Sequence, residues 1–289
     1  MSADMTIIDL SVAISPDSWE PEPIEVEWIN HTAGADKLGR SAWYFERRKG
    51  WRGVLQRFLP ADGRLISHRD FPDAMGLSQM FYRLSTHTGT HVDAPFHYGW
   101  RKNTRDLPDT ISEIPLGWCY GAGVLIDCSA DPREQIDADN VARQCELAGI
   151  SVSEGDIVLI NTGASRLFGR REYFSDYRPI HPSAVSYLLD RGVRVIGTDA
   201  FSFDAPFMQM IAAYRKNGDA SVLWPAHMMG RDRPYLQIER LSNLDRLPKA
   251  NGFRVSCLPI KLEHADAAWS RVVAIFEDRL QPVSVGRTT

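Results

Sequence analysis

Four side chains that can bind a metal ion lie close together in the segment 85–99, which reads STHTGTHVDAPFHYG. They are His87, His91, Asp93 and His97, and all four have odd residue numbers. Imidazole and carboxylate groups are the ligands that Zn²⁺, Mn²⁺ and similar ions take in proteins. Three of the chain's 8 histidines fall in this short segment, which disfavours a chance cluster of structural histidines. The segment therefore predicts a site for Zn²⁺, Mn²⁺ or a similar divalent ion.

The spacing of these residues constrains the backbone. In an extended chain, side chains alternate between faces, so the four odd-numbered residues would share one face. A helix would bring His87 and His91 together, but it would swing Asp93 away by roughly 200°. Pro95 would also break that helix. A straight strand would hold the Cα atoms of His87 and His91 about 13 Å apart. Gly89 lies midway and can bend the backbone, so we expect a bent or bulged strand end.

A site of two histidines and one aspartate leaves coordination positions open for water and substrate, as catalysis requires. A metal in such a site can lower the pKa of a water molecule to ~7 and polarise a carbonyl oxygen. His97 follows Asp93 after a short spacer that contains Pro95. It is either another ligand or, in the interpretation that we prefer, a proton shuttle, because the pKa of imidazole lies near neutrality.

The overall composition is that of an ordinary globular protein, with 44% hydrophobic and 24% charged residues in a chain of 289. The net charge of -4 and the scattered Lys and Arg residues argue against a nucleic-acid partner. The sequence shows neither the ~18 apolar residues of a membrane span nor the basic start of a signal peptide. The four cysteines form no CxxC pair, so we expect no disulfides, no Cys–zinc site and a cytoplasmic location.

Strand-like and helix-like patterns alternate in the middle of the chain, which predicts βαβ units and a mixed, partly parallel sheet. The predicted strands are 6–10, 123–127, 156–160, 193–196, 253–262 and 271–276, and the predicted helices are 137–147 and 182–189. No linker is visible, so we predict a single α/β domain over residues 1–289. Residues 1–80 otherwise look irregular, and 36–80 are a candidate lid or insertion.

The segment HTGTHVDAPFH resembles the HxGTHxDxPxH signature of the cyclase family of metal-dependent hydrolases, which includes kynurenine formamidase and isatin hydrolase. The resemblance covers most of the chain, from IIDLSVAIS onward, and is weakest between residues 36 and 80. It implies a swivelling β/β/α-like fold, a small-molecule substrate, and a homodimer or homotetramer. It also implies that His87, His91 and Asp93 bind the metal and that His97 transfers protons.

The same resemblance points to two distant residues. In formamidases of the family, a further His and a Glu about a dozen residues later complete a site that can bind two metals. The matching positions are His227 and Glu239, in WPAHMMGRDRPYLQIERLSNLDRLP. Without the resemblance, Glu239 is explained as well by a surface acid and His227 by a residue at a helix end. Gln237 precedes Glu239 by two, so in a strand both share a face, and Gln237 is a candidate contact for substrate or for water on the metal.

Three more residues are candidates for substrate contact. Asp199 follows the predicted strand 193–196, and active sites of α/β folds gather at the carboxyl ends of strands. It either lies near the pocket or caps the next turn. Trp224 and Phe201 suit an aromatic substrate, although aromatic side chains belong to the core more often than to a pocket.

Two chemistries are compatible with this site. In one, a water-derived nucleophile attacks an amide or lactam carbonyl, as in formamidases and isatin hydrolases. In the other, a base removes a proton next to a carbonyl and the carbanion closes an aromatic ring. The stretches NHTAGADKLGRSAWY and GRDRPYLQIERLSNLDRLP are more similar to the cyclases of aromatic polyketide pathways, which favours ring closure. Amide or lactam hydrolysis is the alternative, and a non-catalytic metal-binding or ligand-binding protein is the second alternative.

Overall fold

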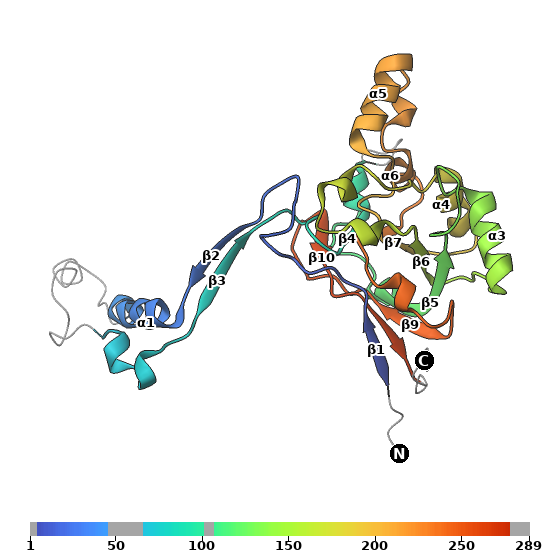
Figure 1. Ribbon diagram of the computed structural model, residues 1–289. Coiled ribbons are helices and arrows are strands. Elements are labelled where there is room, and N and C mark those ends of the chain that lie inside the picture. The colour runs from blue at the N-terminus through green and yellow to red at the C-terminus, as the bar shows by residue number, and fades with distance from the viewer. Residues whose placement is uncertain (1–4, 46–65, 101–106, 278–289) are drawn as a thin grey trace, which may run out of the picture. The chain divides into compact units, whose positions relative to one another are not determined.

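The computed structural model describes residues 5–45, 66–100 and 107–277 (Figure 1). The chain divides into two compact units. The main unit consists of residues 1–21 and 85–289, and the hairpin unit consists of residues 22–84. Within the described residues, no helix is long and apolar enough to cross a membrane.

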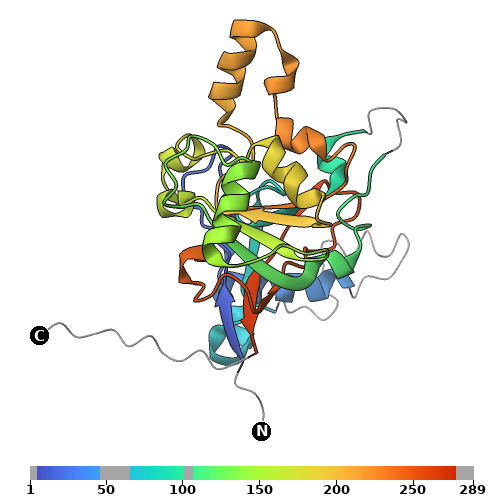
Figure 2. The ribbon, with the colours of Figure 1, turned by 90° about the vertical axis from the view of Figure 1, so that its right-hand side faces the viewer.

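The main unit is built on a nine-stranded mixed sheet with the order β1-β11-β9-β5-β6-β7-β8-β4-β10 (Figures 1 and 2). The strands β5, β6, β7 and β8 pair in parallel, and the other pairs are antiparallel. The bounds are β1 Thr6–Asp9, β4 His91–Asp93, β5 Tyr120–Asp127, β6 Ile157–Asn161, β7 Val195–Thr198, β8 Leu236–Glu239, β9 Phe253–Ser256, β10 Ala267–Trp269 and β11 Val273–Phe276. The predicted α/β class and partly parallel sheet are confirmed.

The helices of the main unit join these strands. The α-helices are α3 Ala138–Ala148, α4 Pro182–Leu189, α5 Phe207–Asn217 and α6 Pro225–Met229. The short 3-10 helices are η3 Pro95–Tyr98, η4 Leu116–Cys119, η5 Ala164–Leu167, η6 Arg171–Phe174, η7 Ala220–Val222 and η8 Leu244–Arg246. Asp137 caps the start of α3 by accepting a hydrogen bond from the N–H of Asn140, and Gly149 ends it in a left-handed conformation. The predicted helix 137–147 thus corresponds to α3.

The parallel strands are buried on both faces, which explains why they read as continuous apolar runs. In β6, Val158 and Ile160 pack in the core that includes residues of α3 and α4, whereas Ile157 and Leu159 pack in the core on the other side of the sheet. Alternate side chains of one strand thus serve two cores. The carboxyl end of β7 leads into the loop that carries Asp199 and Asp204.

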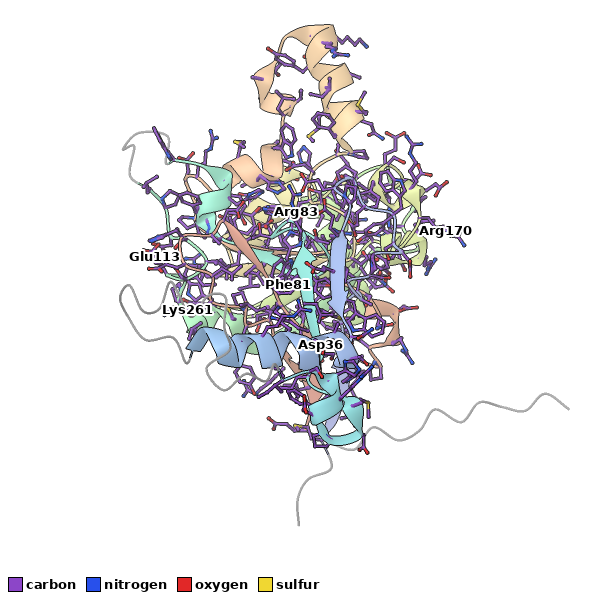
Figure 3. All side chains as sticks on the ribbon, turned by 90° about the vertical axis from the view of Figure 1, so that its left-hand side faces the viewer. Asp36, Phe81, Arg83, Glu113, Arg170 and Lys261 are labelled. Atoms are coloured by element: carbon purple, nitrogen blue, oxygen red, sulfur yellow. The ribbon has the colours of Figure 1, made fainter. Side chains whose placement is uncertain are left out.

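The hairpin unit is more regular than the sequence suggested. It holds β2 Glu25–Ile29 and β3 Gln79–Arg83, paired antiparallel, with α1 His31–Phe45, η1 His68–Asp70 and η2 Pro72–Ala74. Asp36 of α1 accepts a hydrogen bond of 2.7 Å from the backbone N–H of His68, which ties η1 to the helix (Figure 3). The expectation of irregular structure in residues 1–80 is therefore wrong for β2, α1 and β3.

Glycines explain why the pattern hid α1. Gly34 and Gly39 weaken a helix by intrinsic propensity, so the segment looked irregular. In the structure, a Cβ atom at Gly34 would lie 1.9 Å from the carbonyl oxygen of Leu77, and one at Gly39 would lie 2.1 Å from that of Ile66. The glycines therefore allow the returning chain to pass close to the helix. The predicted lid or insertion at 36–80 lies within the hairpin unit, apart from 46–65, which fall outside the described residues. Its role stays a prediction.

Each of the six predicted strands corresponds to an observed strand with somewhat different bounds. The strand predicted at 253–262 ends at Ser256, and the segment that follows it forms no strand. The strand predicted at 193–196 is Val195–Thr198. The helices α5 and α6 were not predicted, since Pro206 and Pro225 beside them look like loop residues in the sequence. Pro225 instead occupies the first turn of α6, where its missing N–H costs nothing.

Candidate metal centre

The motif segment folds as a turn, a short strand and a 3-10 helix. His87 lies in the turn, His91 and Asp93 lie on β4, and His97 lies on η3. Gly89 has φ +71°, which confirms the predicted bend between the two histidines. Only His91 and Asp93 share a face by strand alternation. The other two side chains reach the site because the chain turns before and after the strand.

The turn is held from two directions. The hydroxyl of Thr90 donates a hydrogen bond of 2.6 Å to the carbonyl oxygen of Arg240, and it accepts one of 2.9 Å from the N–H of Val12. A Cβ atom on Gly89 would lie 2.7 Å from a side-chain carbon of Ile14. The glycine is thus required both for its backbone conformation and for the close approach of the N-terminal segment.

Pairing of β4 with its two neighbours brings distant residues to the motif. On one side, β8 places Glu239 opposite His91 and Gln237 opposite Asp93. On the other side, β10 places Ala267 opposite Asp93, so Asp266 lies just before the paired strand. Residues almost 150 positions apart in the sequence therefore meet because three strands are adjacent in the sheet.

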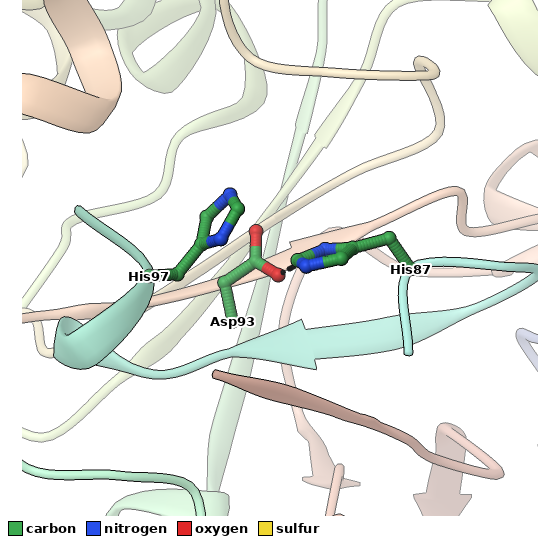
Figure 4. Close-up of side chains that lie close together, drawn as sticks. All are labelled: His87, Asp93 and His97. Atoms are coloured by element: carbon green, nitrogen blue, oxygen red, sulfur yellow. Dashed lines mark ion pairs between the residues drawn. The ribbon is translucent and has the colours of Figure 1, made fainter. Parts of the chain in front are cut away.

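Three ligand atoms form a tight triangle. The Nδ1 atom of His87 lies 3.0 Å from Oδ1 of Asp93 (Figure 4). It also lies 3.1 Å from Nε2 of His91, and that Nε2 lies 3.3 Å from the same Oδ1. Ligand atoms on a tetrahedral zinc ion are roughly 3.3 Å apart, given bonds of about 2.0–2.1 Å. The triangle therefore has the size of one face of a metal coordination shell.

The outer nitrogen atoms of these imidazoles are already engaged. Nδ1 of His91 donates to the carbonyl oxygen of Gly89 at 2.9 Å, and Nε2 of His87 donates to Oδ2 of Asp266 at 2.9 Å. In the neutral rings, the inner nitrogens then carry lone pairs that face each other across 3.1 Å. Two lone pairs at that distance repel unless a cation lies between them. The residues present thus fit a divalent metal.

A second group of ligand atoms lies on the other side of Asp93. His227 comes from α6, and its Nε2 lies 3.7 Å from Oε1 of Glu239 and 4.0 Å from Oδ2 of Asp93. Its Nδ1 donates to Oδ2 of Asp204 at 2.6 Å, which leaves Nε2 free to bind. Within the described residues, neither carboxylate oxygen of Asp93 has a hydrogen-bond donor in suitable geometry, although the side chain is fully buried. Buried charges without donors normally coordinate metals.

The pKa shifts of the acids and histidines in the absence of an ion also indicate that the centre favours positive charge. Burial raises the pKa of Glu239, and the neighbouring Asp93 raises it further. Burial would raise the pKa of Asp93 as well, but His91, His97 and His87 outweigh burial and lower it well below its usual range. Burial would lower the pKa of His87, yet Asp93 and Asp266 raise it to about 10. Without an ion, burial and Asp93 thus oppose the charge on Glu239, whereas the neighbouring histidines favour the charge on Asp93.

His97 lies at the exposed edge of the centre. Its side chain is 30% exposed, and its Nδ1 lies 3.4 Å from Oδ2 of Asp266. Its ring centre is 4.3 Å from that of His87 and 5.5 Å from that of His227. Ligand atoms of His87, Asp93 and His97 lie within 4.8 Å of one another, so the geometry is compatible with both predicted roles, ligand and proton shuttle.

Gln237 is buried beside the centre, opposite Asp93. Its Nε2 donates to the hydroxyl of Tyr235, and its Oε1 has no partner among the described residues. The predicted shared face with Glu239 follows from their alternation on β8. Gln237 therefore presents a free acceptor close to the ligand groups.

Asp199 has a structural role. Its Oδ1 accepts hydrogen bonds of 2.7 Å from both the N–H and the hydroxyl of Thr162, and its Oδ2 accepts one of 3.0 Å from the N–H of Ser165. The carboxylate is buried and occupied by these donors. Asp199 thus holds the turn that follows β6, not the next turn along the chain as predicted, and its place near the pocket stays a prediction.

The two aromatic candidates differ in their surroundings. Phe201 packs against Phe174, with ring centres 4.6 Å apart, and belongs to the cluster around Tyr173 and Tyr177. Trp224 is half-buried, has its ring centre 5.7 Å from that of Phe207, and directly precedes α6, which carries His227. Contact of either residue with a substrate stays a prediction.

Two acids of the centre were missed in the sequence. Asp204 accepts hydrogen bonds from the N–H groups of Ala226 and His227, so it anchors the start of α6 as well as the imidazole. Asp266 contacts His87 and His97. Asp204 stands in GTDAFSFDAP, where only Asp199 was singled out. Asp266 has no motif around it, and only strand pairing reveals its place.

Comparison with known proteins agrees with this site. The sequence model of the family described as "Putative cyclase" matches residues 8–205. The kynurenine formamidase of Salinibacter ruber is 31% identical over 191 residues, which are 66% of this chain and 76% of that protein. The isatin hydrolase of Roseibium aggregatum is 29% identical over 210 residues, which are 66% of this chain and 72% of that protein.

A solved structure of an isatin hydrolase, bound to the product analogue thioisatinate, shares the fold. It superposes with a TM-score of 0.67 at 21% identity and covers 95% of this chain and 93% of that chain. Together these matches define a metal-dependent enzyme of the hydrolase and cyclase class. The chain belongs to the cyclase family.

The names of the relatives bear on the two chemistries predicted from the sequence. The expectation of an enzyme is confirmed, and the two relatives with named activities are hydrolases. The favoured assignment to aromatic polyketide ring closure is not confirmed, and the hydrolase alternative is better supported. His227, Glu239 and Asp266 lie beyond the residues that the family model matches, so their assignment depends on the geometry of the site.

Proposed function

We propose that the protein is a metal-dependent hydrolase that cleaves the C–N bond of a formamide or lactam attached to an aromatic ring. The proposal rests mainly on Asp93. Its two buried carboxylate oxygens lack hydrogen-bond donors among the described residues, and they face imidazole nitrogens on both sides. Histidines on both sides of this carboxylate would allow it to help hold one or two divalent ions. The named activities of the relatives support the choice of hydrolysis over ring closure.

The ligand groups divide into two sets. His87, His91 and Asp93 would hold one ion, of Zn or Mn type, and His227 and Glu239 would hold the second together with Asp93. An ion held there supplies Lewis acidity, which polarises a carbonyl group and makes water more acidic.

His97 is the proposed proton-transfer residue. Hydrolysis adds water across the carbonyl carbon, breaks the C–N bond and leaves the nitrogen in need of a proton. His97 accepts a proton from the attacking water and returns it to the departing nitrogen, so no net proton is gained or lost on the imidazole. Its partial exposure at the edge of the ligand groups lets it contact both water and substrate.

Trp224 and Gln237 are the proposed substrate contacts. Trp224 is half-buried just before α6 and offers an aromatic face to a planar ring. Gln237 offers its free Oε1 as an acceptor for an N–H group or for water. Phe201 and Asp199 are less suited, because the first packs in an aromatic cluster and the second is occupied by hydrogen bonds.

Turnover of N-formylkynurenine and isatin tests the proposal. The purified protein is stripped with a chelator, reloaded with Zn²⁺ or Mn²⁺, and assayed by absorbance. We expect hydrolysis of at least one compound, loss of activity without metal, and recovery on reloading. The His97→Gln variant, which keeps the metal ligands, should lose roughly 10²–10⁴-fold in kcat.

The Asp93→Asn variant, purified in the same way, controls for a contaminating host hydrolase, since it should be inactive. If the metal-loaded wild type cleaves neither compound nor a simple aryl formamide, the proposed hydrolysis is wrong.

A further inference from the structure

We infer that Asp266 is a positioning residue, whose single carboxylate fixes both a metal-binding histidine and the proton-transfer histidine. It accepts a hydrogen bond of 2.9 Å from Nε2 of His87, and the same oxygen lies 3.4 Å from Nδ1 of His97. The role of His97 in this inference rests on the proposed hydrolase function. The role of His87 depends only on the metal site.

The backbone holds Asp266 firmly in place. It directly precedes β10, whose first residue pairs with Asp93, and its carbonyl oxygen accepts a hydrogen bond of 2.9 Å from the N–H of Ala94. Its other carboxylate oxygen accepts a hydrogen bond of 3.0 Å from the hydroxyl of Thr86. The carboxylate is therefore held both through the sheet and through its own side-chain contacts, next to the motif.

The contact with Asp266 determines which nitrogen of His87 binds the metal. Because Nε2 donates to the carboxylate, Nδ1 keeps its lone pair and faces Asp93 and His91. The other two histidines have the opposite arrangement. His91 donates from Nδ1 to the carbonyl oxygen of Gly89, and His227 donates from Nδ1 to Asp204. The geometry thus assigns Nδ1 coordination to His87 and Nε2 coordination to His91 and His227.

The same oxygen orients His97. With Nδ1 directed at Asp266, Nε2 is the nitrogen available for proton transfer. Since the two rings lie 4.3 Å apart and share one acceptor, loss of the carboxylate would free both at once. A surface acid that merely stabilised the fold would affect the unfolding temperature but would not change metal affinity or histidine tautomers.

The experiment compares the wild type with Asp266→Ala and Asp266→Asn. Zinc affinity is measured by competition with a chromophoric chelator, and ring nitrogens are assigned by long-range ¹H–¹⁵N NMR of the zinc-loaded protein. We expect Asp266→Ala to weaken zinc binding 10–100-fold, the range found for residues that orient metal ligands. Asp266→Asn keeps one oxygen acceptor and the shape of the side chain, so its loss should be smaller.

Asp36→Ala is the matched control, because Asp36 also accepts a hydrogen bond from a histidine ring, that of His68, and both side chains are 32% exposed. It should change zinc affinity less than twofold. The NMR spectra of the wild type should show His87 bound through Nδ1 and protonated at Nε2. Coordination of His87 through Nε2, or unchanged zinc affinity in both Asp266 variants, would overturn the inference.

Kinetics separate this inference from the proposed function. If the wild type hydrolyses the substrates, Asp266→Ala, assayed at saturating zinc, should lower kcat at least tenfold with little change in KM, because His97 loses its acceptor and its orientation. A wild-type kcat in that variant would refute the role at His97. If no substrate is cleaved while the NMR and affinity results hold, the proposed hydrolysis fails and the positioning of His87 stands.

Discussion

Asp93 is the residue on which the centre depends, because its carboxylate contacts His87, His91 and His227, whereas Glu239 contacts only His91 and His227 among these ligands. Sequence spacing was sufficient to find it, together with His87, His91 and His97. The spacing could not reveal Asp204 and Asp266, since their places follow from the capping of α6 and from the pairing of β10. His227 and Glu239 came from family resemblance, and the structure brings them to Asp93.

Replacing Asp93 by Asn should abolish the stabilisation that zinc gives. A ligand at 100 times its Kd stabilises the folded state by about 2.7 kcal/mol, and each kcal/mol corresponds to roughly 2–4 °C in a domain of this size class. The wild type should therefore melt several degrees higher with zinc than with EDTA, and Asp93→Asn should show no difference.

Differential scanning fluorimetry measures this shift. Glu113→Gln is a suitable control, because Glu113 also accepts side-chain and backbone hydrogen bonds, here from Thr110, but lies outside the ligand groups. It should respond to zinc as the wild type does. A zinc shift of full size in Asp93→Asn would show that the ion binds elsewhere.

Glu239→Gln should remove one ion and keep the other. Oε1 of Glu239 lies 3.7 Å from Nε2 of His227, and its Oε2 lies 3.6 Å from Nε2 of His91. The first triangle is closed without Glu239 by distances of 3.0, 3.1 and 3.3 Å among His87, His91 and Asp93. We expect two ions per wild-type chain and one in the variant, measured by elemental analysis after gel filtration in metal-buffered solution. Retention of two ions by Glu239→Gln would contradict the division into two sets.

At the scale of elements, the bend at Gly89 positions the first histidine. The glycine could be predicted as a bend because a straight strand keeps the two histidines too far apart. The sequence pattern could not show that Gly89 also packs closely against the side chain of Ile14 in the N-terminal segment. In the same way, α1 was not predicted from the sequence, because Gly34 and Gly39 disfavour a helix by propensity. They are required instead for close contacts with a distant segment, which a local sequence pattern cannot show.

Gly89→Ala should therefore destabilise the protein more than an otherwise similar substitution. Left-handed backbone costs an alanine about 1–2 kcal/mol, and overpacking against Ile14 adds about 1–3 kcal/mol. Gly149→Ala is the control, because Gly149 has φ +63° but a Cβ atom added there would meet no other atom within 4 Å. Urea unfolding gives both values. Equal losses for the two variants would show that the contact with Ile14 does not matter.

At the scale of the whole main unit, a buried ion pair joins the N-terminal segment to the end of β8. Arg240 and Glu20 are paired, with side chains 1% and 5% exposed. Arg240 also donates a hydrogen bond of 3.0 Å to the carbonyl oxygen of His87 and lies over the ring of Phe201. The pair thus links the first residues of the chain, the aromatic cluster and the metal-binding turn.

Glu20→Ala should cost about 3–5 kcal/mol of unfolding free energy, because it leaves the buried guanidinium of Arg240 without its charge partner. Zinc affinity should fall as well, since the carbonyl of His87 is held by the same guanidinium. Equilibrium unfolding and chelator competition measure the two effects. A loss below about 1 kcal/mol, the level of an exposed pair, would show that the pair is not an anchor.

The central claim is that an ion lies between His87, His91 and Asp93. Crystals of the zinc-loaded protein, measured just above and just below the zinc absorption edge, test it most directly. The account predicts an anomalous peak within bonding distance of Nδ1 of His87, Nε2 of His91 and Oδ1 of Asp93. A protein that binds zinc in solution but shows no anomalous peak beside Asp93 would contradict it.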